Sequence, residues 1–227
     1  LSMARQYNPT AISLDIFLPD MLGWTVLNQL KRDPATRHIP VQIMTVEEER
    51  QHGLEHGAFS YMVKPITTEG LEGALDRVKE YASRRVKRLL VVEDSEAERM
   101  SIVELLAHDD VQITTAATGA EAMTTLHEQN YDGVVLDLRL PDTSGFDLLE
   151  RIQADSELRD VPIIVFTGKE LSPDEENRLR TVAKSIVIKG VQSPDGLLDG
   201  TALFLHRVVT DLPQEKQRML ERLHQTD

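Results

Sequence analysis

The sequence predicts an α/β fold in which a doubly wound parallel sheet of five strands occurs twice, with the first copy truncated at its N-terminus. Three observations lead to this prediction: an internal repeat, an alternation of short strand-like segments with helical patterns, and polar residues directly after four of those segments. Strands that alternate with helices are typical of a parallel sheet whose two faces are covered by helices.

The internal repeat has a constant offset of 122 residues over most of its length. Residues 11–20, AISLDIFLPD, match residues 133–142, GVVLDLRLPD, and Gly23 matches Gly145. Matching residue types over more than 30 positions at one offset indicate a duplicated domain. The further identities are Asp33 with Asp155, Arg37 with Arg159, Pro40 with Pro162, Thr45 with Thr167 and, at an offset of 125, Lys64 with Lys189.

Five short segments of the second copy predict strands, because each has strand length and helical patterns separate them. Most are continuously apolar, as expected for strands that are buried on both faces of a sheet. The predicted strands are 88–92, 111–116, 133–137, 161–167 and 185–189.

A helix is predicted after each of these strands. Ser95 with Glu98 has the spacing of a capping box, in which a hydroxyl and a carboxylate satisfy free N–H groups of the first turn. The last helix is predicted over roughly residues 195–210. The remaining helix starts are Thr118 with Glu121, Ser144 with Gly145, and Ser172 with Pro173 and Glu175.

The repeat divides the chain into four predicted parts. Residues 1–82 form a partial copy that lacks the first two strands and helices, and residues 83–88 form a linker. Residues 89–210 form the complete copy, and residues 211–227 form an amphipathic C-terminal helix or tail. The strand at 11–15 would have an unpaired edge, which is an aggregation hazard, so we expect the chain to be a piece of a larger protein.

Composition and charge exclude several classes of function. The chain has no cysteine, which excludes disulfides, cysteine-ligated metals and a thiol nucleophile, and no apolar run of membrane-spanning length. Of the net charge of −13, residues 87–227 carry −12, which disfavours binding to nucleic acid. The acidity has two interpretations, a solubilising surface or an acidic site that binds a cation. We expect a cytoplasmic protein without membrane contact.

Polar residues lie at the ends of four predicted strands of the second copy, as the last strand residue or directly after it. They are Glu93 and Asp94, Asp137, Thr167 and Lys189. The carboxyl ends of parallel strands meet at one edge, so these side chains should form one site. Three carboxylates need a cation, and an all-oxygen ligand set favours Mg²⁺. An aspartate can act as a nucleophile toward phosphorus, and a hydroxyl and an ammonium can hold the phosphoryl oxygens. The residues therefore predict an aspartate that is phosphorylated beside Mg²⁺.

At these positions the sequence resembles the receiver domain of response regulators in two-component signalling, which has a flavodoxin-like fold. The resemblance covers nearly all of residues 87–210 and, less completely, residues 5–83. It implies a histidine kinase or a phosphotransfer domain as partner, and a hybrid histidine kinase or a multi-receiver regulator as the source of these residues. The implied roles are Asp137 as acceptor of phosphate from a phosphohistidine, Thr167 and Lys189 as ligands of the phosphoryl oxygens, and Glu93, Asp94, Asp137 and the backbone carbonyl of Arg139 as ligands of Mg²⁺.

Two departures from the receiver pattern occur in the second copy. Gly190 stands where the family usually has proline, and Ile186 stands where many receivers have a switching aromatic residue. The first copy keeps Asp15, Thr45 and Lys64, but it lacks the acid pair of a first strand. We therefore expect the first copy to bind Mg²⁺ poorly and to remain unphosphorylated. A second copy of the chain is a candidate partner through the receiver surfaces.

Two other functions remain open at this point. A phosphatase of the haloacid dehalogenase class also uses a strand-end aspartate, but it needs a second aspartate two residues later, where this chain has Phe17 and Arg139. A scaffold that no longer responds to phosphate is the other alternative, given Gly190 and Ile186. The sequence shows no kinase dimerisation helix or glycine-rich ATP box, so we expect no kinase activity from these residues.

Overall fold

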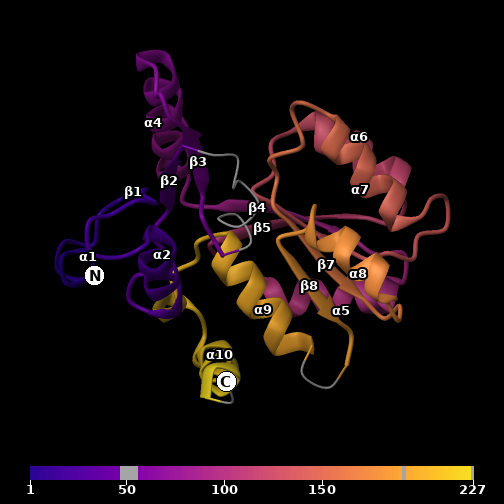
Figure 1. Ribbon diagram of the computed structural model, residues 1–227. Helices are drawn as coiled ribbons and strands as arrows, with labels where there is room; N and C mark the ends of the chain where they lie inside the picture. The colour runs from indigo at the N-terminus through magenta and orange to yellow at the C-terminus, as the bar shows by residue number, and fades with distance from the viewer. Residues whose placement is uncertain (47–55, 191–192, 226–227) are drawn as a thin grey trace. The chain divides into compact units, whose positions relative to one another are not determined.

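The computed structural model describes residues 1–46, 56–190 and 193–225, which form two compact units (Figure 1). The first unit comprises Leu1–Arg85 together with Ala202–Val209. The second unit comprises Val86–Thr201 and Thr210–Asp227. Each unit contains one parallel sheet, so the duplication read from the sequence corresponds to two separate sheets.

The sheet of the second unit has five parallel strands in the order β5-β4-β6-β7-β8. This order, with the first strand in chain order beside the third, is that of a doubly wound sheet and confirms the predicted fold class. Both faces are covered, since strand residues of both orientations, such as Leu89 and Leu90, are fully buried. The strands are β4 (Lys87–Val92), β5 (Val111–Ala116), β6 (Gly133–Leu136), β7 (Ile163–Thr167) and β8 (Ser185–Ile188).

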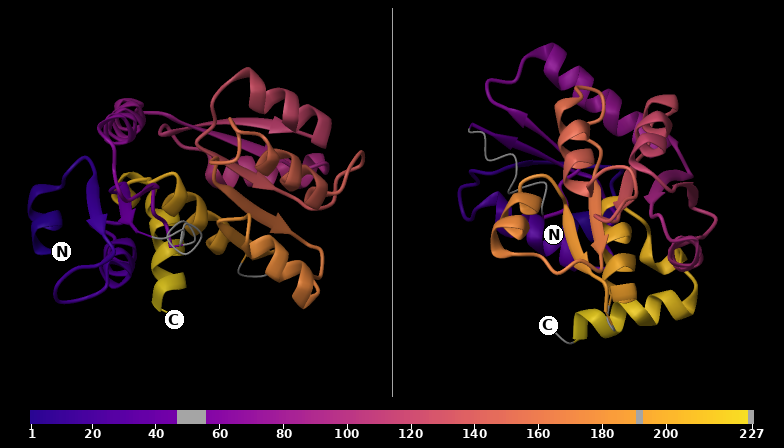
Figure 2. Two further views of the ribbon diagram at one scale, coloured as in Figure 1. Left: turned by 45° about the horizontal axis from the view of Figure 1, so that its top comes forward. Right: turned by 90° about the vertical axis from the view of Figure 1, so that its right-hand side faces the viewer.

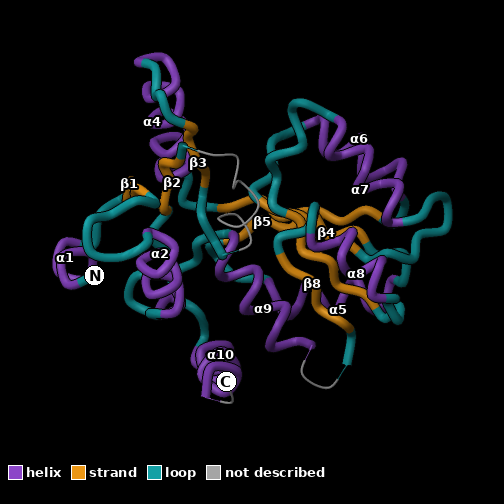
Figure 3. Tube along the Cα trace, in the orientation of Figure 1, coloured by secondary structure: helices purple, strands orange, loops and turns teal. Residues whose placement is uncertain are grey.

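Helices cover the two faces of this sheet (Figure 3). One face packs against α6, α7 and α8, which contribute Leu126, Leu149 and Leu179 to a common apolar core with the strands. On the other side, α10 lies beside α9 (Figure 2). Lys216 Nζ of α10 donates to the carbonyl of Ala107, directly after α5, at 2.7 Å. The helices are α5 (Glu96–Leu106), α6 (Gly119–Glu128), α7 (Gly145–Ala154), α8 (Pro173–Arg180), α9 (Ser193–Phe204) and α10 (Gln214–Gln225), with a short 3-10 turn at Val209–Asp211.

The described sheet of the first unit has three parallel strands in the order β1-β2-β3. β1 is equivalent to β6 of the second unit, but its described strand partner is β2 alone, whereas β6 lies between β4 and β7. The strands are β1 (Ile12–Asp15), β2 (Val41–Thr45) and β3 (Ser60–Val63), and the helices are α1 (Ser2–Tyr7), α2 (Gly23–Arg32) and α4 (Thr68–Ser83).

Two of the boundaries that differ from the predicted ones have a physical reason in the structure. β4 begins at Lys87, inside the predicted linker 83–88, because Lys87 already pairs with Val111. The last helix ends near Phe204 rather than at about 210, because His206 adopts the left-handed conformation with φ of 47°. The N–H groups of His206 and Arg207 donate to the carbonyls of Leu203 and Ala202, respectively, which is the pattern of a Schellman cap.

The last residues of α9 and the cap that follows them, Ala202–Val209, belong to the first unit. The hydroxyl of Tyr81 donates to the carbonyl of Leu205 at 2.6 Å, and the rings of Phe59, Tyr81 and His206 contact one another with centroids 4.9–5.8 Å apart. Through these contacts, residues 202–209 pack against residues 1–85 and form one unit with them.

One glycine in each copy lies against the end of a strand. Gly145 donates its N–H to the carbonyl of Leu138 at 2.9 Å, and a Cβ at Gly145 would lie 2.5 Å from Leu138 Cα and 3.1 Å from Asp137 O. The equivalent Gly23 has the same kind of contact, since a Cβ there would lie 2.2 Å from Asp15 O. Only glycine allows α2 and α7 to start this close to the strand-end aspartate.

Replacing Gly145 by alanine should destabilise the second unit by about 1–3 kcal/mol, because the added methyl group overlaps backbone that cannot move aside. Urea unfolding followed by circular dichroism measures the change. Gly190→Ala is the matched control, because a Cβ at Gly190 meets nothing within 4 Å. An equal stability of the two variants would contradict the overlap.

The first unit contains a buried lysine that the sequence analysis did not single out. Lys31 is 6% exposed, and its Nζ donates to the carbonyls of Arg37 and Ile39 at 3.0 and 2.7 Å and lies 3.4 Å from Nδ1 of His206. Burial disfavours the ammonium, and repulsion from the Arg37 guanidinium adds to this, so the pKa of Lys31 falls to about 7.

This lowered pKa predicts that the first unit becomes more stable as pH rises from 7 to 9. In that range the unfolded chain keeps the proton on Lys31 and the folded chain releases it, so stability increases with pH by up to about 2 kcal/mol. Below pH 7 both states hold the proton and the dependence disappears. Fluorescence of Trp24, the single tryptophan, reports urea unfolding of this unit. Lys31→Met should remove the slope, whereas Lys79→Met, at an exposed position, should keep it.

Candidate functional site

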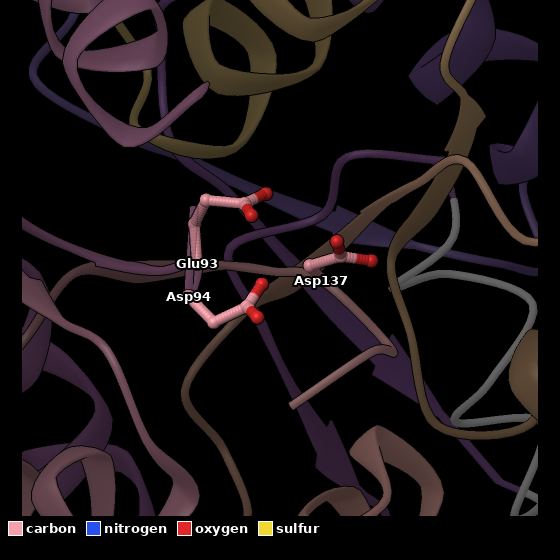
Figure 4. A group of neighbouring side chains, drawn as sticks. All are labelled: Glu93, Asp94 and Asp137. Atoms are coloured by element: carbon pink, nitrogen blue, oxygen red, sulfur yellow. The ribbon is translucent and has the colours of Figure 1, made fainter. Parts of the chain in front are cut away.

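Three carboxylates meet at the carboxyl ends of β4 and β6 (Figure 4). Val92 and Leu136, the last residues of the two strands, are paired in register, and Asp137 N–H continues the ladder by donating to the carbonyl of Val92 at 2.9 Å. Glu93 and Asp137 therefore follow neighbouring strands at the same level. One oxygen from each of Glu93, Asp94 and Asp137 lies within 4.8 Å of the others.

Two of these carboxylates are buried. Glu93 is 1% exposed and Asp137 is 5% exposed, whereas Asp94 is exposed. Burial raises the pKa of Glu93 above its ordinary value, an effect that hydrogen bonding and attraction to Lys189 oppose. The site thus concentrates negative charge in a place where water screens it poorly.

Lys189, directly after β8, supplies a positive charge to this cluster. Its Nζ lies 2.7 Å from Glu93 Oε2 and 3.0 Å from Asp137 Oδ2, and it forms a third ion pair with Glu98. Burial opposes the charged form of Lys189, but the hydrogen bonds to the three carboxylates outweigh it and raise the pKa of Lys189 above its ordinary value. Lys189 therefore remains an ammonium at neutral pH.

Both carboxylate oxygens of Asp137 are held by donors. The hydroxyl of Thr167, the last residue of β7 and fully buried, donates to Oδ1 at 2.7 Å, and the N–H of Arg139 approaches the same oxygen at 3.3 Å. Lys189 holds Oδ2. Asp137 is thus fixed between a hydroxyl and an ammonium, and its position is set by three strands of one sheet.

The structure brings together Glu93, Asp94, Asp137, Thr167 and Lys189, the five side chains that the sequence analysis selected in the second copy. Arg139, selected for its backbone carbonyl, lies in the loop directly after Asp137.

Glu98 was missed because its spacing from Ser95 assigned it to a capping box. Only half of that box forms: Glu98 N–H donates to Ser95 Oγ at 3.4 Å, but the Glu98 carboxylate binds Lys189. The N–H of Ser95 donates instead to Glu93 Oε1 at 3.1 Å. An acid one turn after two strand-end acids was the available signal for a fourth carboxylate at this edge.

The equivalent residues of the first copy have a different environment. Asp15 is part-exposed and forms an ion pair with Lys64, whose hydrogen bond holds the pKa of Asp15 below its ordinary value. Thr45 is buried at the end of β2. Within the described ranges of the chain, the acidic cluster at Glu93 is the one group of three potential metal ligands.

The comparison with known proteins decides the family. The sequence profile of the response regulator receiver domain matches residues 1–76 and 89–199. The chain belongs to the response regulator receiver family. Both copies are therefore receiver domains, and tandem receivers account for most of the sequence.

Individual relatives match parts of the chain. PleD, a response regulator of Caulobacter vibrioides, is 46% identical over 69 residues, which is 29% of this chain and 15% of PleD. The two-component response regulator ORR3 of Oryza sativa is 32% identical over 109 residues, which is 47% of this chain and 82% of ORR3. In the solved structure of the chemotaxis response regulator CheY4 of Vibrio cholerae, the sequence is 25% identical to this chain, with a TM-score of 0.48 over 52% of this chain and 98% of CheY4.

Among the helices of the described residues, none is both long and apolar enough to span a bilayer.

Mg²⁺ should stabilise the second receiver domain, because a divalent cation offsets the repulsion among Glu93, Asp94 and Asp137. At a concentration ten times its dissociation constant the gain is about 1.4 kcal/mol, measured as a shift of the urea midpoint with and without chelator. Asp94→Asn should abolish the shift, and Asp109→Asn, at an exposed loop position, should preserve it. A midpoint that is insensitive to Mg²⁺ in the parent protein would contradict a cation site.

Proposed function

We propose that the second receiver domain accepts a phosphoryl group on Asp137 in a phosphorelay. Membership of the receiver family supports a role in two-component signalling. The observation that carries the residue assignment is the hydrogen bonding of Asp137, whose two oxygens accept from Thr167 Oγ1 and Lys189 Nζ beside two further carboxylates.

The proposed transfer begins when one carboxylate oxygen of Asp137 attacks the phosphorus of a phosphohistidine. The new O–P bond forms as the P–N bond breaks, and the imidazole of the donor leaves with the electron pair. Thr167 and Lys189 then exchange a hydrogen bond to the carboxylate for one to a phosphoryl oxygen. Such transfers depend mainly on positioning and on neutralisation of charge, and this side-chain set supplies both.

Glu93, Asp94 and Asp137, with the backbone carbonyl of Arg139, would hold Mg²⁺. Their fit rests on the chemistry of the donors, which are all oxygens, and on the 4.8 Å span of the three carboxylates. When bound, the ion supplies positive charge for the phosphoryl oxygens. The partner in this proposal is a histidine kinase or a phosphotransfer domain in the cytoplasm, and the parent protein is a hybrid histidine kinase.

We propose that the first receiver domain, with only the residues of this sequence, does not accept a phosphoryl group on Asp15. Asp15 pairs with Lys64 as Asp137 pairs with Lys189, but the described residues around Asp15 lack the acid pair that accompanies Asp137. Without that pair, the site has no set of carboxylates for a divalent cation.

Incubation with acetyl phosphate and Mg²⁺ should add one phosphoryl group to the unsubstituted chain and none to the Asp137→Asn variant. The reason is that Asp137 is the nucleophile of the proposed transfer, so the amide removes the acceptor oxygen. Intact mass spectrometry after acid quenching measures the addition. Asp109→Asn should behave like the parent protein.

Other outcomes would favour the other functions. Modification that maps to Asp15 would contradict the inactivity of the first domain. Turnover of phosphate esters would indicate a phosphatase, although Arg139 occupies the position of its general acid. A complete lack of adduct in the parent protein would indicate a scaffold that does not respond to phosphate.

A further inference from the structure

Glu98 makes a contact that its place in the sequence did not predict. It lies in the first turn of α5, and its carboxylate forms an ion pair with Lys189, although 53% of the Glu98 side chain is exposed. The same sequence pattern at Ser172 and Glu175 forms both halves of a capping box. Glu98 therefore departs from the local helix-capping geometry and is directed to the site.

The ammonium of Lys189 has three N–H donors, and three carboxylates accept from it. These are Glu93 at 2.7 Å, Asp137 at 3.0 Å, and Glu98. A phosphoryl oxygen that binds Lys189 must displace one of these acceptors. A phosphoryl group on Asp137 therefore competes with these carboxylates for the N–H donors of Lys189.

Among the three acceptors, Glu98 is the easiest to displace. The Glu93 side chain is 2% exposed and also accepts from Ser95 N–H, so its release would leave a buried charge without a donor. Asp137 is itself the proposed acceptor of the phosphoryl group. The half-exposed carboxylate of Glu98 can return to water at small cost, as is usual for exposed ion pairs.

We propose that Glu98 is a positioning residue that holds the ammonium of Lys189 in the unphosphorylated domain and competes with the phosphoryl group for it. This inference rests on the proposed function of Asp137. Glu98 also adds a fourth carboxylate to the site, so the loss of its contact with Lys189 must be distinguished from a general loss of negative charge.

Three variants separate these effects. Glu98→Gln removes the charge and weakens the contact, and Glu98→Asp keeps the charge but shortens the side chain by one methylene and so loses reach to Lys189. Glu96→Gln removes one charge from the same helical turn and is the matched control. The substituted positions are exposed, and circular dichroism verifies that the variants are folded.

The first measurement is the concentration of beryllofluoride, a mimic of the phosphoryl group, that half-saturates the protein at fixed Mg²⁺, followed by fluorine NMR. Glu98→Gln and Glu98→Asp should each lower this concentration about two- to fivefold, the range expected from loss of one exposed ion pair, and Glu96→Gln should leave it unchanged. The second measurement is the Nζ resonance of Lys189 in ¹⁵N-labelled protein without beryllofluoride. It should shift in both Glu98 variants and stay in place in Glu96→Gln.

The outcomes separate this inference from the proposed function. If the parent protein forms no beryllofluoride adduct, the role of Asp137 fails and the competition fails with it. If the parent forms the adduct but the Glu98 variants have the same half-saturation as the parent, the competition alone is wrong. Weaker binding in Glu98→Gln, or tighter binding in Glu98→Gln but not in Glu98→Asp, would also overturn it, since the first indicates assistance by Glu98 and the second a general effect of charge.

Discussion

The parallel pairing of β4 with β6 sets the separation of Glu93 and Asp137, and the electrostatics of the second receiver domain depend on it. The register brings Val92 beside Leu136, so the residues that follow carry two buried carboxylates to the same edge of the sheet. The carboxylates of Glu93 and Asp137 repel each other because water screens them poorly. The ammonium of Lys189, directly after β8, forms an ion pair with both and offsets this repulsion. The strand order therefore determines which carboxylates pair with Lys189, and these ion pairs raise the pKa of Lys189.

The described residues of the first receiver domain repeat several of these side chains in a different environment. Asp15, Thr45 and Lys64 repeat Asp137, Thr167 and Lys189, and the glycine contact after the strand is retained as well. In the described sheet, however, β1 has no strand in the place that β4 occupies beside β6. Asp15 and Lys64 then neutralise each other as a part-exposed ion pair, and burial does not concentrate charge. Among the described residues, the difference between Asp15 and Asp137 thus lies in the neighbours of each aspartate, since Asp137 lies beside Glu93 and Asp94.

The predictable parts of the fold were those with a local physical cause. β5 was predicted at its observed bounds, and the starts of α5, α6 and α8 were marked by hydroxyl caps that the structure contains. The end of α9 was not predictable, because its left-handed cap falls on His206 rather than on glycine. Lys31 and Glu98 were also missed, since the burial of Lys31 depends on tertiary packing and the ion pair of Glu98 is with a residue 91 positions away in the chain. Strand-end acids were predictable as a set because parallel topology alone brings them together.

Glu98 shows why a capping pattern is weak evidence for what a side chain contacts. A carboxylate at the third helical position gains about as much from a free N–H as from an exposed ammonium, so neighbouring charges decide between them. At Ser172 the nearby Lys169 contacts Glu175 without displacing it from the cap, and both interactions coexist. At Ser95 the N–H is already occupied by the buried carboxylate of Glu93, which leaves Glu98 available to Lys189. The burial of Glu93, itself fixed by the strand pairing, therefore determines the position of a residue one helical turn away.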